Sequence, residues 1–301
     1  MSAALDAWRR AGEAFDHRGH RIFYRRQGGA GGGPCLLLIH GFPTASWDWH
    51  RVWDGLSERF PTRVAADMIG FGFSAKPRPY PYAVADQADL QEALLERLGI
   101  GRVHVLAHDY GDTVAQELLA RHQERRAQGR GGLELASVCF LNGGLFPEAH
   151  RPTRAQRLMA GPLGPLLVRA FTRRAFGRAL GAIFGPHTRP TEAELDDLWE
   201  IVTEDGGLYL APQLLGYIEE RRRHRERWVG ALQSTRVPLR VIDGAEDPVS
   251  GAHMVERYRE LVPNPDTVLL PGIGHYPQVE DADGVTREFL AFHTRLGTPR
   301  P

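Results

Sequence analysis

The turn Leu106-Ala107-His108-Asp109-Tyr110-Gly111-Asp112 stands between a run of β-formers, residues 103–106, and a helical pattern over residues 113–121. Ala107 and Gly111 lie two positions on either side of Asp109, so a strand can turn sharply into a helix there. Such a turn lifts one side chain above the sheet and aims the next residue's N–H at the same point. The residue at the apex is Asp109, so the chemistry of this turn is that of a carboxylate.

The composition is typical of a soluble enzyme. The chain has 301 residues, enough for one large α/β domain or two small ones, with 42% hydrophobic and 25% charged residues. The formal net charge is zero, so nucleic acid is not an expected partner. Residues 1–13 hold no apolar signal-peptide core, and no stretch approaches the roughly 18 apolar residues of a membrane helix. Cys35 and Cys139 lie in apolar runs, so we expect buried thiols and a cytoplasmic protein.

Short apolar runs alternate with helical patterns along most of the chain. Residues 13–27 are expected to form two strands, and residues 35–39 form an apolar run typical of a buried parallel strand. Residues 47–59 and 84–98 repeat apolar side chains at helical spacing. The alternation predicts a mostly parallel central sheet with helices on both faces, in the α/β class. Ligands bind at the carboxyl ends of such strands, where the following loops carry His40, Asp67, Asp109 and Asn142.

The alternation stops between residues 145 and 234, after the sixth predicted strand. Four helical runs replace it: residues 154–159, 163–176, 192–202 and 212–228. A helical insertion between two parallel strands lies above the strand ends, so residues 145–234 are predicted to form a lid. Residues 1–144 and 235–301 then form the core domain.

Within this predicted lid, residues 151–189 carry eight arginines and no acidic residue. The arginines are interleaved with the apolar side chains of Leu166, Leu167, Phe171, Phe176 and Phe184. One interpretation is a basic amphipathic surface that touches lipid. The other, which we favour, is a cap whose apolar face covers the active site, so membrane contact is not expected.

Two further residues complete a catalytic constellation around Asp109. Asp247 follows the predicted strand at residues 238–242, at a Gly-x-x-Asp-Pro turn, and His275 follows the strand at residues 267–270 in a glycine-lined loop. The order Asp109, Asp247, His275, with a strand–turn–helix first, is that of nucleophile, acid and histidine in α/β-hydrolases. We therefore predict a nucleophile at Asp109, a general base at His275, and an orienting acid at Asp247.

An aspartate nucleophile needs no proton removed, because its carboxylate is already charged at neutral pH. It suits attack on an sp³ carbon bearing a leaving group, which leaves an alkyl ester on the enzyme. His275, oriented by Asp247, would then take a proton from the water that attacks the ester carbonyl. The resulting oxyanion needs fixed donors, which we assign to the main-chain N–H groups of Phe42 and Tyr110. His40 is expected to brace its loop.

Seven motifs stand out along the chain: His40-Gly41-Phe42-Pro43, Gly70-Phe71-Gly72-Phe73-Ser74, His108-Asp109-Tyr110-Gly111, Asn142-Gly143-Gly144-Leu145-Phe146-Pro147-Glu148, Phe184-Gly185-Pro186, Arg227-Trp228-Val229-Gly230-Ala231-Leu232 and Gly274-His275. They resemble motifs of the α/β-hydrolases that include epoxide hydrolases and haloalkane dehalogenases. Within that group the chain looks most similar to the mesoderm-specific transcript proteins, over residues 40–278. The resemblance implies the α/β-hydrolase fold, the triad of Asp109, Asp247 and His275, and a cis bond at Phe42-Pro43. It implies no substrate.

The leaving group separates the subclasses of this family. Epoxide hydrolases supply two lid tyrosines as proton donors, and the predicted lid contains Tyr209 and Tyr217. Dehalogenases place a tryptophan directly after the nucleophile, where this chain has Tyr110, which lacks an indole N–H. Trp199 and Trp228 could in principle hold a halide, although packing is the expected role of each.

The sequence thus predicts an α/β-hydrolase that opens epoxides through an ester on Asp109, with water and a small apolar organic molecule as substrates. A haloalkane dehalogenase is the alternative within the class. A lipid- or small-molecule-binding protein without turnover is the alternative outside it, since fold alone does not fix function. No ligand-spaced cluster of His, Cys or Asp occurs in the sequence, so neither a metal nor an organic cofactor is expected.

Overall fold

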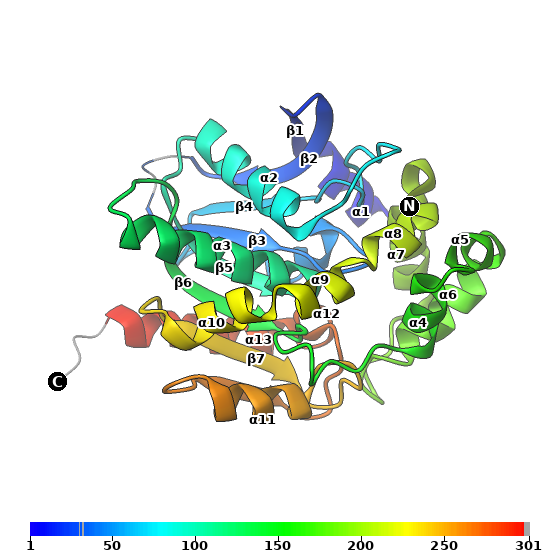
Figure 1. Cartoon of the computed structure of the whole chain (residues 1–301). Coiled ribbons are helices and arrows are strands. Elements are labelled where there is room, and N and C mark those ends of the chain that lie inside the picture. Colours follow the sequence, from blue (N-terminus) through cyan, green and yellow to red (C-terminus); the bar gives the residue numbers. More distant parts are fainter. Residues whose placement is uncertain (30, 32, 298–301) are drawn as a thin grey trace.

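The computed structural model describes residues 1–29, 31 and 33–297, and it is organised around an eight-stranded sheet (Figure 1). The strands lie in the order β1-β2-β4-β3-β5-β6-β7-β8. β2 pairs antiparallel with β1 and β4, and the strands from β4 to β8 pair in parallel. The mostly parallel sheet predicted from the sequence is therefore confirmed. The strands are β1 (Gly12–His17), β2 (His20–Gln27), β3 (Cys35–Ile39), β4 (Thr62–Ala66), β5 (Arg102–His108), β6 (Glu134–Leu141), β7 (Leu239–Gly244) and β8 (Thr267–Leu270).

Helices cover both faces of this sheet. In Figure 1, α2 and α3 lie in front of the sheet, whereas α13 lies behind it. β3 and β4 are buried along their whole length, as expected for strands covered on both sides. Cys35 and Cys139 are buried free thiols, as predicted. The helices of this core are α1 (Ala3–Arg10), η1 (Ser46–Trp49), α2 (Val84–Arg97), α3 (Tyr110–Ala127), α11 (Ala252–Leu261), α12 (Pro277–Glu280) and α13 (Ala282–Gly297).

The segment between β6 and β7, residues 145–234, contains helices and no strand, and the structure describes every residue of it. We call it the inserted segment. In Figure 1 its helices lie along one side of the molecule and across the front of the sheet. Across the described ranges of the chain, no helix combines the length and apolar character needed to cross a membrane. The helices of the inserted segment are α4 (Arg154–Ala160), α5 (Gly164–Leu167), η2 (Val168–Ala170), α6 (Arg173–Gly181), α7 (Glu192–Thr203), η3 (Glu204–Leu210), α8 (Ala211–Leu214), α9 (Tyr217–Arg223) and α10 (Arg225–Ser234).

Two helices expected in the inserted segment are broken. Residues 163–176 form α5 and η2, and α6 begins only at Arg173, because Thr172 caps it by accepting a hydrogen bond from the Ala175 N–H. Residues 212–228 form parts of three helices, which are separated around Gly216 and at His224. In residues 212–228 the apolar spacing identified buried side chains, but in residues 163–176 Leu163, Leu166 and Leu167 are exposed. Apolar spacing carries no information on where the chain turns toward a new neighbour.

Residues 47–59 also differ from the helix expected there. Only η1 is helical, and turns follow it, in which the Trp49 carbonyl accepts from both the Val52 and the Trp53 N–H groups, at 3.2 and 2.9 Å. Trp49, Val52, Trp53 and Leu56 are nevertheless all buried. The spacing predicted correctly which side chains face the core, although the backbone follows successive turns and does not form a regular helix.

Candidate active site

The turn between β5 and α3 holds Asp109 in a conformation that few residues other than glycine adopt, with φ of 47° and ψ of −105°. Two glycines, Gly111 in this turn and Gly41 in the loop after β3, are needed because other groups approach their Cα atoms closely. A Cβ on Gly111 would lie 2.2 Å from the Ile39 carbonyl oxygen, and one on Gly41 would lie 2.7 Å from Nδ1 of His108. The local sequence therefore produces the sharp elbow that its small residues predicted.

The carboxylate of Asp109 lies against the loop that follows β3. The Phe42 N–H donates to Oδ2 of Asp109 at 3.1 Å, and the Phe42–Pro43 peptide is cis, as the resemblance implies. Tyr110 is the first residue of α3, where main-chain N–H groups have no partner within a helix. The structure thus brings together Asp109 and the two residues expected to supply oxyanion donors.

His40 stabilises this loop through two hydrogen bonds of its ring. Its Nδ1 donates to the Gly41 carbonyl at 2.8 Å, while its Nε2 accepts from the Met68 N–H at 2.9 Å. Burial lowers the pKa of His40, so the ring stays neutral and can serve as donor on one side and acceptor on the other. These bonds match the bracing role expected for it.

His275 and Asp247 form a hydrogen-bonded pair at the ends of β8 and β7. Nδ1 of His275 donates to Oδ2 of Asp247 at 2.7 Å, which leaves Nε2 for reaction. Asp247 is buried and also accepts from the N–H groups of Val249 and Ser250, at 2.8 and 3.0 Å, and from the Asn142 amide at 3.0 Å. Burial alone would raise the pKa of Asp247, but the charge of His275 outweighs it and holds that pKa below its usual value.

The same pair sets the protonation of His275. Burial lowers the pKa of an imidazole, but the charge of Asp247, its hydrogen bond and the charge of Asp109 raise the pKa of His275 to about 9. For Asp109, burial opposes ionisation, whereas the charges of His275 and Arg221 outweigh it and lower the pKa. Near neutral pH the resting site therefore holds an ionised Asp109 beside a protonated His275.

The histidine just before the elbow, His108, connects it to the His275 loop. Nε2 of His108 donates to the main-chain oxygen of His275 at 2.8 Å. Burial lowers the pKa of His108 to about 3, so its ring stays neutral. The sequence motif contained His108 without indicating a role for it, because its partner lies on a loop far along the chain.

Arg221 is the residue of the site that the sequence did not reveal. Its side chain is 1% exposed, and its Nη2 donates to the main-chain oxygen of Asp109 at 3.0 Å and lies 3.6 Å from Oδ1 of the same residue. Its Nε donates to Oγ1 of Thr113 at 2.7 Å. The sequence offered one indication of its position. Arg221 lies four residues after Tyr217, so the two side chains share one face of the predicted helix.

The two candidate tyrosines lie in different surroundings. Tyr217 is fully buried, with its ring centroid 4.6 Å from that of Tyr110 and 4.5 Å from the Arg221 guanidinium carbon. Its hydroxyl has no hydrogen-bond partner among the described residues. Burial and the charge of Asp109 raise the pKa of Tyr217, so its proton is retained. Tyr209 is 50% exposed, and neither tyrosine is among the residues that line the cavity described below.

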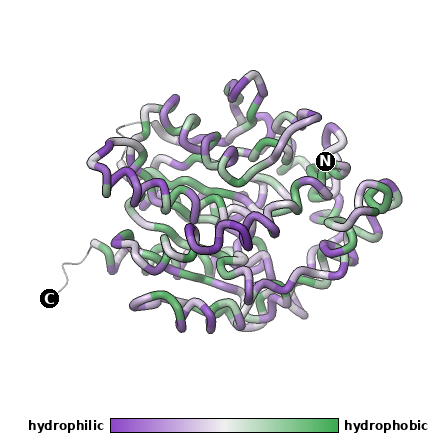
Figure 2. The backbone as a smooth tube through the Cα atoms, viewed as in Figure 1, coloured by the Kyte–Doolittle hydropathy of each residue, from purple (hydrophilic) through white to green (hydrophobic). Residues whose placement is uncertain are grey.

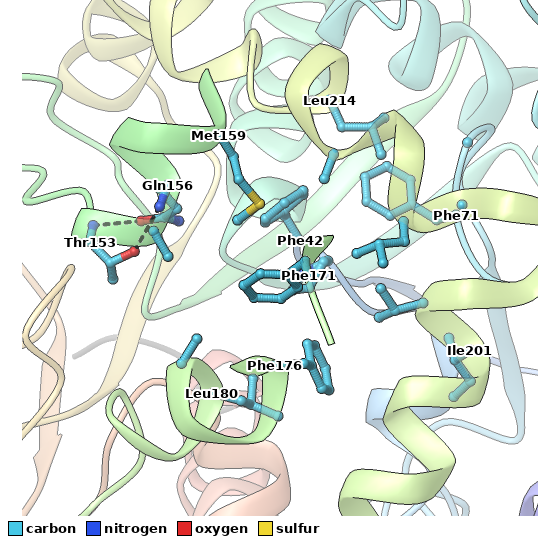
Figure 3. Close-up of a pocket in the computed structure, with 18 of the residues that line it drawn as sticks. Phe42, Phe71, Thr153, Gln156, Met159, Phe171, Phe176, Leu180, Ile201 and Leu214 are labelled. Carbon is cyan, nitrogen blue, oxygen red and sulfur yellow. Dashed lines mark hydrogen bonds between the residues drawn. The ribbon is translucent and has the colours of Figure 1, made fainter. Parts of the chain in front are cut away.

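A cavity of about 90 Å³ lies between the core and the inserted segment (Figure 3). Its walls are mostly apolar, with Phe42 and Phe71 contributed by core loops and Phe171 and Phe176 by the inserted segment. His275 is the triad member on its wall. Such a cavity suits a small apolar molecule with few polar atoms.

Neither tryptophan considered as a halide ligand lines this cavity. Nε1 of Trp228 donates to Glu117 at 2.8 Å, so its N–H is already used. The Trp199 ring packs against that of Phe176, with 5.6 Å between centroids.

Comparisons with known proteins agree with this fold. A model of the alpha/beta hydrolase family matches residues 36–288. The mesoderm-specific transcript protein of Mus musculus is 44% identical over 299 residues, which cover 97% of this chain and 88% of that protein. The solved structure of epoxide hydrolase CorEH superposes with a TM-score of 0.76 at 20% identity, covering 95% of this chain and 99% of that one. Haloalkane dehalogenase DbeA from Bradyrhizobium elkani gives a TM-score of 0.74 at 22% identity, covering 94% and 99%.

Proposed function

The chain belongs to the alpha/beta hydrolase family, and from this premise we propose that it opens epoxides with water through an ester on Asp109. The observation that carries the proposal is the pairing of a carboxylate at the elbow with a buried, unpartnered tyrosine hydroxyl beside it, that of Tyr217. A carboxylate attacks an sp³ carbon, and an epoxide oxygen needs a proton donor as its ring opens.

In the first step, Oδ1 of Asp109 attacks one epoxide carbon. The bond from that carbon to the ring oxygen breaks, and the oxygen takes the proton of the Tyr217 hydroxyl. An alkyl ester remains on Asp109. Oδ2, which accepts from the Phe42 N–H, becomes the carbonyl oxygen of that ester, so the donor needed in the next step is already in place.

In the second step, His275 first gives its resting proton to the Tyr217 phenolate and then removes a proton from a water that attacks the ester carbonyl carbon. The negative charge develops on Oδ2, between the N–H groups of Phe42 and Tyr110. The bond to the diol oxygen then breaks, and that oxygen takes the proton held by His275. Asp109 leaves this step as a carboxylic acid, whose proton returns to His275. The site regains its resting protonation, and one water and one epoxide give one diol.

The charge of Asp109 determines at which stage His275 can act as a base. The negative charge of Asp109 is one of the causes that raise the pKa of His275 to about 9 in the resting site. Ester formation removes that charge, so the pKa of His275 falls at the stage where the neutral ring is required. The same change would be of no use to a protein that only binds its ligand.

We further propose that the inserted segment, residues 145–234, is a lid over a core formed by residues 1–144 and 235–301. Phe171, Phe176 and Leu180 from this segment form one wall of the cavity. Apolar walls keep bulk water away from the reacting atoms and favour a small apolar substrate.

The dehalogenase alternative is less well supported by the side chains. A halide leaving group needs N–H donors, but Trp228 donates to Glu117, and the residue after the nucleophile is Tyr110. Among the described residues, the donors near Asp109 that have no partner include the Tyr217 hydroxyl and Nη1 of Arg221. A hydroxyl that can release a proton fits an epoxide oxygen, which must be protonated, better than a halide, which leaves as an anion.

The experiment is to expose a His275→Gln variant to styrene oxide and, separately, to 1-bromobutane, and to measure intact-protein mass. Without the base the second step stalls, so an adduct on Asp109 from the epoxide alone is the expected result. An adduct from the haloalkane alone would replace the proposal with the dehalogenase. Absence of adducts from both, with an inactive wild type, would favour a binding protein. The double variant Asp109→Ala, His275→Gln is the control and should remain unlabelled.

A further inference from the structure

Four leucines on the inserted segment face solvent. Among the described residues, seven large hydrophobic side chains are exposed, and four of these lie within ten residues of one another. Such clustering distinguishes a patch from the single exposed apolar residues that any protein carries. We call this patch the leucine tip; its members and exposed fractions are Leu158 at 62%, Leu163 at 65%, Leu166 at 65% and Leu167 at 39%.

The leucine tip lies at the outer edge of the molecule. It runs from α4 into α5, and Figure 1 shows α5 at the extreme end of the inserted segment, away from the sheet. Figure 2 shows hydrophobic residues at this edge. The sequence led us to expect that the apolar side chains of this stretch cover the active site. Phe171 and Phe176 do line the cavity, but the leucine tip does not.

Exposed arginines lie close to the leucine tip in the sequence. Arg154, Arg157 and Arg169 bracket it in the sequence and are all exposed. They belong to the stretch from residue 151 to 189, with its eight arginines and no acid. Within the described part of the chain, Arg173 is the member of this set with an acidic partner, pairing with Glu192 and Asp196. The guanidinium groups beside the leucine tip are therefore not neutralised by the protein itself.

We propose that the leucine tip and its flanking arginines bind the surface of a bilayer that contains anionic lipids. Leucine side chains can enter the boundary between headgroups and acyl chains, while guanidinium groups pair with lipid phosphates. A second copy of the chain fits this surface poorly, because a twofold contact would bring the two sets of Arg154, Arg157 and Arg169 together. An anionic surface complements both the apolar and the charged part of the patch.

This contact would place the cavity next to the membrane. α4 carries Leu158 on its exposed side, whereas Gln156 and Met159 of the same helix line the cavity (Figure 3). One helix therefore separates the proposed lipid-binding surface from the site of chemistry. The binding itself does not rest on the proposed epoxide reaction, since it needs neither Asp109 nor His275.

The test is co-sedimentation of the full chain with sucrose-loaded vesicles of phosphatidylcholine alone or mixed with phosphatidylglycerol. We expect binding to the anionic vesicles, weakened at high ionic strength because salt screens the arginines. Replacing Arg154, Arg157 and Arg169 with serine should weaken binding by roughly fivefold for each arginine. Replacing the four leucines of the tip with serine should weaken it at least as much, by about a hundredfold or more.

Two controls keep the result specific. Replacing Arg97, Arg126 and Arg130, which are exposed on α2, at the end of α3 and just after it, removes the same charge elsewhere and should leave binding unchanged. Thermal unfolding of each variant checks that the fold persists. Failure of the wild type to bind anionic vesicles, or binding that survives both sets of replacements, would overturn the proposal. A concentration-dependent dimer that the leucine replacements dissociate would assign the surface to a second copy.

Discussion

Arg221 donates a hydrogen bond from Nη2 to the main-chain oxygen of Asp109, at 3.0 Å, from a side chain that is 1% exposed. A buried guanidinium is costly unless its charge and its donors are matched. Here the charge lies 3.6 Å from the Asp109 carboxylate and Nε donates to Thr113, while Nη1 has no hydrogen-bond partner among the described residues. The inserted segment is therefore tied to the elbow through α9, and one cation serves both the position and the charge of Asp109.

The first prediction concerns the charge of Arg221. Its guanidinium is one of the groups that lower the pKa of Asp109 against the effect of burial, so Arg221→Met should raise that pKa. Attack needs the ionised carboxylate. The fall in the rate of ester formation at low pH, its acidic limb, should therefore move to higher pH. The measurement is the rate of adduct formation by mass spectrometry in a His275→Gln background across pH. Arg223→Met, an exposed change on the same helix, is the matched control. An unmoved acidic limb would remove Arg221 from this role.

The second prediction separates the two tyrosines. Tyr217→Phe removes a buried hydroxyl with no partner among the described residues, so the fold should tolerate it. Ring opening should nevertheless slow by about a hundredfold or more, as is usual when a general acid is lost. Single-turnover labelling of Asp109 by styrene oxide gives this rate directly.

Tyr209→Phe is the natural comparison, because Tyr209 is half exposed, whereas Tyr217 is buried beside Asp109. Its labelling rate should equal that of the wild type. If Tyr209→Phe slowed labelling and Tyr217→Phe did not, the assignment of the donor would be reversed.

The parts of the site that could be predicted are those whose position follows from topology. Asp109, Asp247 and His275 each lie in the turn or loop that follows a predicted parallel strand, and such strands end at one edge of a sheet. The small residues Ala107 and Gly111 on either side of Asp109 indicated the elbow, because only small residues fit a strand that turns into a helix so closely. Local spacing and strand order carry that information.

Arg221 could not be predicted because nothing local distinguishes it. Lys76 is the only lysine among 37 basic residues, so arginine is abundant, and Arg221, Arg222 and Arg223 are adjacent. Burial separates the first from the other two, and burial depends on how α9 packs against the elbow. The exposure of Leu158 and its neighbours was hidden for the same reason, since the breaks between the inserted helices decide which way each apolar face points.

The third prediction concerns the coupling of Asp109 to His275. Burial lowers the pKa of His275, but the charges of Asp247 and Asp109 raise it to about 9. Asp109→Asn imitates the uncharged ester, so the pKa of His275 should fall. A ¹⁵N NMR titration of the imidazole in the wild type and in Asp109→Asn measures it, with the exposed Asp54→Asn as a control that should leave the value unchanged. Equal values in Asp109→Asn and the wild type would show that ester formation does not release the base.

The last prediction concerns stability in acid and rests on a cluster away from the active site. Oγ of Ser137 lies 2.8 Å from Nδ1 of His104 and 3.0 Å from Nε2 of His293. Burial lowers the pKa of His104 to about 3 and that of His293 to about 4, whereas an unfolded histidine titrates near 6.5. The stability contributed by each neutral ring is therefore complete above about pH 6.5 and is lost as pH falls toward the folded-state value.

Each such histidine should reduce the free energy of unfolding by about 1.4 kcal/mol per pH unit in that range. His293→Gln removes one of the two side chains of this cluster that take up a proton when the protein unfolds below about pH 6.5. The difference in unfolding free energy between pH 7 and pH 5, measured with urea, should therefore be about 2 kcal/mol smaller in the variant than in the wild type. His187→Gln, at an exposed position, should keep the wild-type difference. If His293→Gln lost as much stability as the wild type over this interval, the buried ring would not be titrating on unfolding.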